Sequence, residues 1–176
     1  MTETRTLVAC ADCAALWTLD IDPAACADPA HEHQRFELHR HLEVVMMPDG
    51  TEVIAASFDA ADPYTRDRPP AFGLYLDPQW QPPWPHDHID WPDFGVPDDE
   101  APVVAALHAL LDRARRGEVV EIGCLGGHGR TGTALACLAT LSGVAADEAV
   151  AWVRSAYCGD AVETAEQEAF VAHLEP

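Results

Sequence analysis

The stretch "VVEIGCLGGHGRTGTALACL", residues 119–138, joins two apolar runs through a loop that contains three glycines. The first run is short and β-branched, which predicts a buried parallel strand, and the second run predicts a buried helix. A loop between a strand and a helix exposes several backbone N–H groups, and the helix N-terminus adds partial positive charge. We therefore predict an anion site in this loop, and a phosphate would fit it.

The side chains around this loop favour catalysis over nucleotide binding. A nucleotide-binding P-loop ends in lysine followed by Ser or Thr, and the chain contains no lysine. Instead, Cys124 begins the loop, and Arg130 and Thr131 end it. Backbone N–H groups that bind an oxyanion also stabilise a thiolate, so we expect Cys124 to be a nucleophile. Arg130 can bind two phosphate oxygens with its planar guanidinium, and Thr131 can donate a hydrogen bond to the departing thiolate.

The residues between the nucleophile and the arginine are candidates for phosphate binding. The glycines among them let the backbone curl around an anion without Cβ clashes. Of the five, the histidine is the one whose side chain could touch the substrate. These candidates are Leu125, Gly126, Gly127, His128 and Gly129.

A general acid is expected in "IDWPDFGVPDD", residues 89–99. An alcohol or phenol leaving group needs a proton, and a positioned acid accelerates such a step by roughly 10²–10⁴-fold. Asp93 is the candidate. We expect its apolar neighbours to desolvate its carboxyl partly, and a bound phosphate to repel its anion, so that both favour the protonated form.

Two motifs together carry a family resemblance. C-L-G-G-H-G-R-T-G at 124–132 resembles the C-x-x-G-x-x-R-[ST]-G signature of cysteine-dependent protein tyrosine and dual-specificity phosphatases. W-P-D-F-G-V-P at 91–97 is similar to their general-acid loop, and "GDAVETAEQEAF" at 159–170 resembles a segment near the end of the dual-specificity catalytic domain. The acid precedes the nucleophile, as in that family. The resemblance covers roughly residues 42–175 and indicates a compact bacterial member.

The resemblance implies a two-step mechanism without a metal or other cofactor for catalysis. Cys124 attacks phosphorus to form a phosphocysteine while Asp93 protonates the leaving oxygen, and Asp93 then accepts a proton from the hydrolytic water. Gln167 matches a glutamine that helps to place this water, although a structural role in a helix-capping box is at least as good an explanation. The implied substrate is a phosphorylated protein or a small phosphomonoester.

The chain departs from the family at one position, because Gly123 stands where histidine usually precedes the nucleophile. That histidine helps to order the loop and to favour the thiolate, so we expect reactivity to be weaker or tuned in another way. Two alternatives therefore stay open: a catalytically weak phosphate-binding reader and a sulfurtransferase of the rhodanese type. Asp93 argues against both, because neither needs an acid loop.

The fold class predicted is α/β, with a central, mostly parallel sheet, helices on both of its faces and a protein tyrosine phosphatase-like arrangement. Residues 1–41 are expected to form a small N-terminal Cys/His extension, and residues 42–176 the dual-specificity-phosphatase-like catalytic domain. A hairpin is predicted around Pro48-Asp49-Gly50, and Asp98 is the expected cap of the first helix. The other predicted elements are a strand at 72–76 and helices at 133–141, 147–157 and from 165.

Composition limits the partners. The 176 residues carry 10 Lys+Arg against 30 Asp+Glu, a formal net charge of -20, which disfavours nucleic acid and anionic membrane surfaces. No apolar run reaches the roughly 18 residues of a membrane helix, and no signal peptide is visible, so we expect a cytoplasmic protein. Nothing in the pattern predicts the oligomeric state.

The start of the chain contains a second group of reactive side chains. "CADC" at 10–13 is followed by Cys26 and by His31, which together make a Cys₃His set with workable spacing for tetrahedral zinc. His33 is a substitute for His31. A redox-active cysteine pair and reduced cysteines without a partner are the alternatives. We predict a structural zinc ion bound by Cys10, Cys13, Cys26 and His31.

Overall fold

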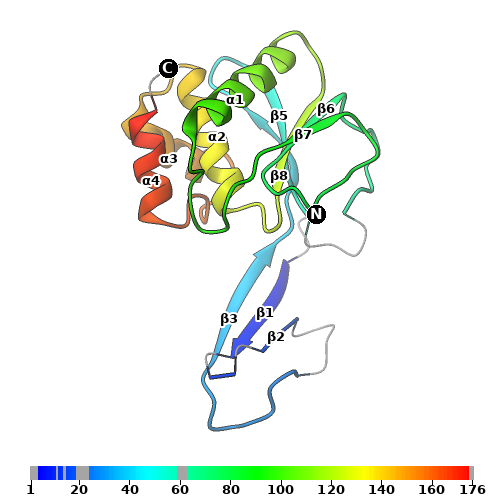
Figure 1. Cartoon of the computed structure of the whole chain (residues 1–176), viewed down its shortest axis with the longest axis vertical. Helices are drawn as coiled ribbons and strands as arrows, with labels where there is room; N and C mark the ends of the chain where they lie inside the picture. Colours follow the sequence, from blue (N-terminus) through cyan, green and yellow to red (C-terminus); the bar gives the residue numbers. More distant parts are fainter. Residues whose placement is uncertain (1–3, 11, 14, 19–23, 59–62, 175–176) are drawn as a thin grey trace. The chain divides into compact units, whose positions relative to one another are not determined.

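The computed structural model describes residues 4–10, 12–13, 15–18, 24–58 and 63–174 (Figure 1). The chain divides into two compact units, Met1–Arg40 and His41–Pro176. Each unit has its own sheet and its own cluster of buried apolar residues.

The first unit contains a three-stranded antiparallel sheet that the sequence pattern did not predict. Its strands are β1 (Thr4–Cys10), β2 (Leu16–Thr18) and β3 (His33–His39), in the order β2-β1-β3. Val8, Cys10 and Cys26 form a small buried cluster beside it. The thiols of this unit are therefore held by a folded element.

The second unit is built on a five-stranded sheet in the order β4-β5-β8-β6-β7. Three of its strand pairs are parallel: β5–β8, β8–β6 and β6–β7. The remaining pair, the β4–β5 hairpin, is antiparallel. This confirms the predicted mostly parallel sheet, and the hairpin turns at Pro48-Asp49-Gly50 as expected. The strands are β4 (Leu42–Met46), β5 (Glu52–Ser57), β6 (Phe72–Tyr75), β7 (His86–His88) and β8 (Val120–Cys124).

Four helices complete this unit: α1 (Glu100–Arg115), α2 (Gly129–Leu141), α3 (Ala146–Ala156) and α4 (Ala165–His173). Asp99 caps α1 by accepting a hydrogen bond from the Ala101 N–H, so the predicted cap at Asp98 is wrong by one residue. Helix α2 begins four residues earlier than predicted and includes the arginine of the glycine loop. Among the described residues, no helix is both long and apolar enough to span a membrane.

The prediction of helices on both sheet faces is corrected by the packing. Alternate residues of β8 and β6, such as Ile122 and Leu74, join one core with the helices. The opposite face belongs to a separate aromatic cluster, in which Phe58 and Tyr75 pack with Trp84. In the described part of the chain, loops between β5 and β7 therefore cover the face where a second helical layer was expected.

Candidate active site

Cys124 ends β8, and its side chain is buried beneath the glycine loop. The Thr131 hydroxyl, from the first turn of α2, donates a hydrogen bond to the Cys124 Sγ at 3.0 Å. A donor at this distance stabilises negative charge on sulfur. The strand and the helix thus bring the predicted nucleophile and Thr131 into direct contact.

The backbone of the loop adopts a conformation that its sequence permits. Gly127 has φ of +78°, a left-handed value that favours glycine. Its carbonyl oxygen accepts a hydrogen bond of 2.7 Å from the Tyr157 hydroxyl, just after α3. Leu125 is exposed, whereas His128 and Gly129 are buried. The five predicted loop residues therefore lie between the nucleophile and the arginine, with one apolar side chain toward solvent.

Arg130 is buried, and its guanidinium is bound by residues that follow β6 and by residues that follow β7. Its Nη1 donates to the backbone oxygens of Leu76 and Trp91 and to the Asp77 carboxylate, at 3.1–3.3 Å. Its Nη2 lies 3.3 Å from Asp93 Oδ1. The buried Nε has no hydrogen-bond partner among the described residues. A buried guanidinium nitrogen without a partner is costly, so a bound oxyanion would satisfy it.

Asp93 lies in the loop between β7 and α1 and approaches the anion site through its ion pair with Arg130. The expected desolvation by its neighbours is not present: the Asp93 side chain is 58% exposed, and Phe94 is also exposed. Trp91 is buried, but its indole N–H donates to the Gly95 oxygen at 2.9 Å. Trp91 therefore stabilises the backbone of this loop, and the apolar residues of the loop do not cover the Asp93 carboxyl.

Gln167 is fully buried at the start of α4 and contacts the acid loop. Its Nε2 donates to the Gly95 oxygen at 3.3 Å, and its Oε1 accepts from the Glu163 N–H at 2.9 Å. Thr164 Oγ1 caps the helix by accepting from the Gln167 N–H. The hydrogen bond of Thr164 confirms the helix cap that the sequence predicted. The role of Gln167 in placing a water molecule stays a prediction.

Two acidic residues that sequence reasoning missed also face the site. Asp77 pairs with Arg130; despite its partial burial, hydrogen bonds from Gln79 and this arginine hold the pKa of its carboxyl below the ordinary value. Glu163 lies against Gly129, and partial burial of its carboxyl together with the charge of Asp93 raises its pKa. Asp77 lies outside the quoted motifs, and Glu163 lies within the segment 159–170, where nothing in the pattern singles it out.

The structure explains why glycine occupies position 123. A Cβ at this position would lie 2.6 Å from the Ala56 oxygen of β5 and 2.9 Å from the Phe58 ring. Strand β8 therefore approaches its neighbour too closely for any side chain, and the histidine usual in the family does not fit this backbone.

We expect Gly123→Ala to destabilise the protein by about 1–3 kcal/mol, because an added methyl group forces strands apart in a packed core. Thermal unfolding of the purified variant measures this. Gly159→Ala is the control, since no atom lies within 4 Å of a Cβ built there, and its midpoint should stay close to the parent value. Equal midpoints for the two variants would show that the close approach at Gly123 is tolerated.

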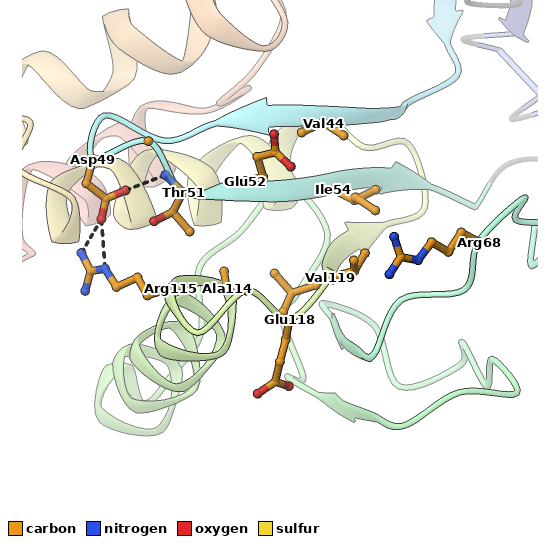
Figure 2. Close-up of a pocket in the computed structure, with 13 residues that line it drawn as sticks. Val44, Asp49, Thr51, Glu52, Ile54, Arg68, Ala114, Arg115, Glu118 and Val119 are labelled. Atoms are coloured by element: carbon orange, nitrogen blue, oxygen red, sulfur yellow. Dashed lines mark hydrogen bonds and ion pairs between the residues drawn. The ribbon is translucent and has the colours of Figure 1, made fainter.

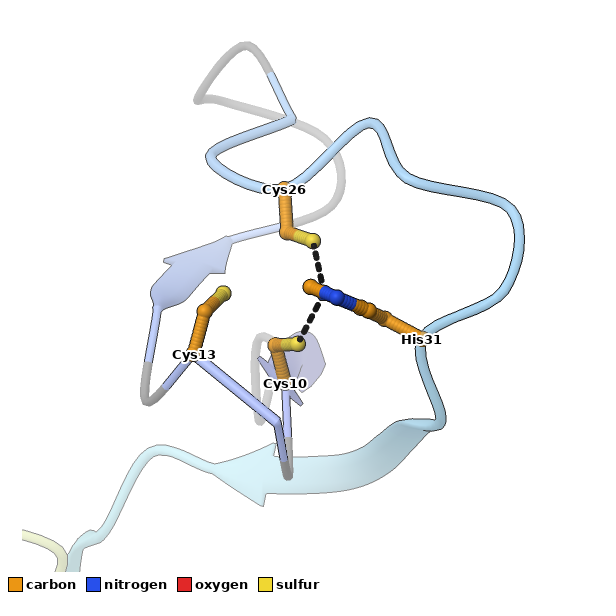
Figure 3. A group of neighbouring side chains, drawn as sticks. All are labelled: Cys10, Cys13, Cys26 and His31. Atoms are coloured by element: carbon orange, nitrogen blue, oxygen red, sulfur yellow. Dashed lines mark hydrogen bonds between the residues drawn. The ribbon is translucent and has the colours of Figure 1, made fainter.

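The four predicted metal ligands in the first unit come together (Figure 3). Their donor atoms all lie within 4.8 Å of one another, and His31 Nδ1 is 3.5 Å from Cys10 Sγ and 3.3 Å from Cys26 Sγ. His33 is outside this group. Although burial opposes it, hydrogen bonds from the Cys13 backbone and thiol lower the pKa of Cys10 to about 6.

An open hollow elsewhere on the second unit is not the reaction site (Figure 2). It lies between the β4–β5 hairpin and the end of α1, where Arg115 pairs with Asp49. Cys124, Arg130 and Asp93 do not line it.

Comparison with known proteins agrees with this geometry. Residues 89–171 match the family described as Swiss Army Knife protein, DSP-PTPase phosphatase domain. An uncharacterised protein of Methanocaldococcus jannaschii is 42% identical over 83 residues, 45% of this chain and 52% of that protein. The crystal structure of Tk-PTP in the active form matches with a TM-score of 0.57 and 28% identity, over 72% of this chain and 92% of that chain. Kinase associated phosphatase shares the fold, with a TM-score of 0.58 at 14% identity, over 74% and 92% of the two chains.

The fold of the second unit is similar to that of solved phosphatase structures, and the predicted site residues Arg130 and Asp93 are paired in it. Residues 89–171, slightly less than half of the chain, match the DSP-PTPase phosphatase domain, in agreement with the resemblance of the motifs. The chain spans about half the length of the curated relatives it matches, 52% and 48%. Both of these relatives are archaeal, so the bacterial origin stays a prediction.

Proposed function

We propose that the protein hydrolyses phosphomonoesters through a phosphocysteine intermediate, as a protein phosphatase of the tyrosine or dual-specificity type. The observation that carries this proposal is the ion pair of 3.3 Å between Arg130 and Asp93. It brings the acid loop to the same anion site that Cys124 borders, where Thr131 already donates to the sulfur. Nucleophile, anion ligand and acid are thus supplied by three segments of one unit.

In the first step, the Cys124 thiolate attacks phosphorus, and the bond to the leaving oxygen breaks. Loop N–H groups and the Arg130 guanidinium hold the equatorial oxygens, which carry the charge in the transition state. Asp93, protonated once phosphate has replaced it beside Arg130, gives its proton to the leaving oxygen. The products are a phosphocysteine and an alcohol or phenol.

In the second step, water attacks the phosphocysteine and the S–P bond breaks. Asp93, now a carboxylate, accepts the proton of the water, and Gln167 is the residue proposed to place that water. Thr131 stabilises the departing Cys124 thiolate with its hydrogen bond. Inorganic phosphate is released, and the sequence of bonds made and broken needs no cofactor.

The acidic surroundings of the site bear on the substrate. Asp77, Asp93 and Glu163 all face Arg130, so a substrate that adds one phosphoryl group is favoured over a polyanion. Phosphorylated protein and small phosphomonoesters meet this condition, and nucleic acid and anionic membranes do not. The cytoplasmic location remains a prediction.

The test is hydrolysis of an aryl phosphate such as p-nitrophenyl phosphate without added metal. We expect turnover under these conditions, because protein groups carry the proposed steps. Transfer of sulfur from thiosulfate to cyanide would favour the rhodanese-type alternative. Phosphate binding without turnover of any aryl phosphate would favour the phosphate-binding reader.

We also propose that the first unit binds a structural zinc ion through Cys10, Cys13, Cys26 and His31. The distances between these donors support tetrahedral coordination, and Asp28 Oδ2 lies 3.7 Å from His31 Nε2, where it can orient the ring. The small apolar cluster of this unit is a weak source of stability, which a metal would supplement.

Metal analysis of protein purified without chelator should find zinc that depends on these cysteines. In Cys10→Ser/Cys13→Ser this zinc is expected to be lost, and the first unit should become sensitive to proteolysis, because metal binding is coupled to folding. Cys137→Ala is the control, since that thiol is buried in α2. Equal zinc content in the double variant and the control would contradict the assignment.

A further inference from the structure

A second cluster of metal-ligating side chains lies against the phosphate-binding loop. His41 Nε2 faces His128 Nε2 at 3.2 Å, and the Cys158 thiol completes a group whose donor atoms lie within 4.8 Å of one another. The three residues come from different segments: His41 precedes β4, His128 begins α2, and Cys158 follows α3. Both histidines are buried and the cysteine is half-buried.

The spacing of the two Nε2 atoms fits a metal ion. Zinc bonds to imidazole nitrogen at about 2.0–2.1 Å, so two nitrogens on one tetrahedral ion lie about 3.3 Å apart. The observed 3.2 Å matches this spacing, and it is also compatible with one shared hydrogen bond. The distance therefore fits both a zinc ion between the two nitrogens and a direct hydrogen bond.

The neighbours of the pair favour the metal. His41 Nδ1 lies 2.7 Å from Glu43 Oε1, so in the tautomer that donates from Nδ1 to this carboxylate the Nε2 lone pair is directed at His128. A carboxylate behind a histidine is the usual support of a metal ligand. A hydrogen-bonded pair needs no third donor, whereas zinc prefers imidazole together with thiolate, and Cys158 supplies it.

We propose that His41, His128 and Cys158 form a second zinc site, which would join the phosphate-binding loop to β4 and to the end of α3. Gly127 packs directly over this cluster, because a Cβ there would meet His41 and the Tyr157 hydroxyl. An ion bound at this place would hold the loop in its observed conformation. The three protein donors leave the fourth position of a tetrahedron to water.

The test uses the full chain with the first unit's thiols removed, Cys10→Ser/Cys13→Ser/Cys26→Ser. This variant should still bind one zinc ion, and its cobalt form should show a thiolate-to-cobalt charge-transfer band. Adding Cys158→Ser should remove the band, and adding Glu43→Gln should weaken the affinity by about 10–100-fold. Cys124→Ser in the same background must keep the band, since the nucleophile is not a proposed ligand.

A triple-serine variant that binds neither zinc nor cobalt would overturn the proposal, and so would a band that survives Cys158→Ser. If the serine substitutions disturb folding, the zinc content of the parent chain tests the proposal instead. It should hold two zinc ions per chain, falling to one in His41→Gln/Cys158→Ser; a zinc content that is the same in both would refute the site. These readouts are metal content and absorption, so they are independent of turnover.

Discussion

Cys124→Ser is expected to abolish phosphatase turnover, with a loss on the order of 10⁶-fold, the scale seen when an enzyme loses its nucleophile. The hydroxyl of serine ionises far less readily than a thiol, so neither the loop N–H groups nor Thr131 can supply an alkoxide at neutral pH. Initial rates with p-nitrophenyl phosphate measure the loss. Calorimetric titration with inorganic phosphate should show that binding survives, because Arg130 and the loop are unchanged.

Cys137→Ala is the matched control for this experiment. Burial raises the pKa of Cys137 to about 12, so this thiol stays protonated and takes no part in the proposed reaction. Its replacement should leave the rate close to that of the parent chain. Full activity in Cys124→Ser would show that another group is the nucleophile.

Asp93→Asn should lower turnover by roughly 10²–10⁴-fold for substrates with poor leaving groups and much less for good ones. An alkyl oxygen needs the proton that Asp93 supplies, whereas p-nitrophenolate leaves without it. A series of aryl and alkyl phosphates measures this difference as the slope of log kcat/KM against leaving-group pKa, because kcat/KM reports the formation of the phosphocysteine and not its hydrolysis, which is common to all substrates. The slope should become steeper in the variant.

Asp90→Asn provides the comparison, because Asp90 is exposed and lies three positions earlier in the same loop. It removes the same charge without removing the proposed acid, and its slope should equal that of the parent. A uniform loss across the series in Asp93→Asn would assign Asp93 to the positioning of Arg130 rather than to proton transfer.

Local patterns were sufficient to predict the elements that carry the chemistry. The hairpin at Pro48-Asp49-Gly50, strand β8 and the loop that follows it each have a signal within a few residues, through turn residues, β-branching or glycines. The contact of Thr131 with Cys124 follows from the short loop between β8 and α2. The order of acid and nucleophile was also visible, since both lie in recognisable motifs.

Contacts between distant segments were not visible in the sequence. His41 and His128 are 87 residues apart, and nothing in either local pattern predicts that they meet. Strand β7 has three residues, too few for a periodic signal, and its existence depends on pairing with β6. The exposure of Asp93 was mispredicted because composition indicates which residues are apolar, not which way the loop turns them.

From the ion pairs of Arg130 we expect phosphate binding to be coupled to the uptake of a proton. Without phosphate, the single positive charge of the Arg130 guanidinium faces the two negative charges of the Asp77 and Asp93 carboxylates. The net charge of these three groups is therefore negative. A phosphate dianion that displaces Asp93 would add further repulsion unless a carboxyl takes up a proton as it binds. Binding and protonation are then linked, so affinity for phosphate should decline as pH rises. The enthalpy of binding should accordingly depend on the ionisation heat of the buffer, so that the uptake of a proton can be measured before any bond is broken.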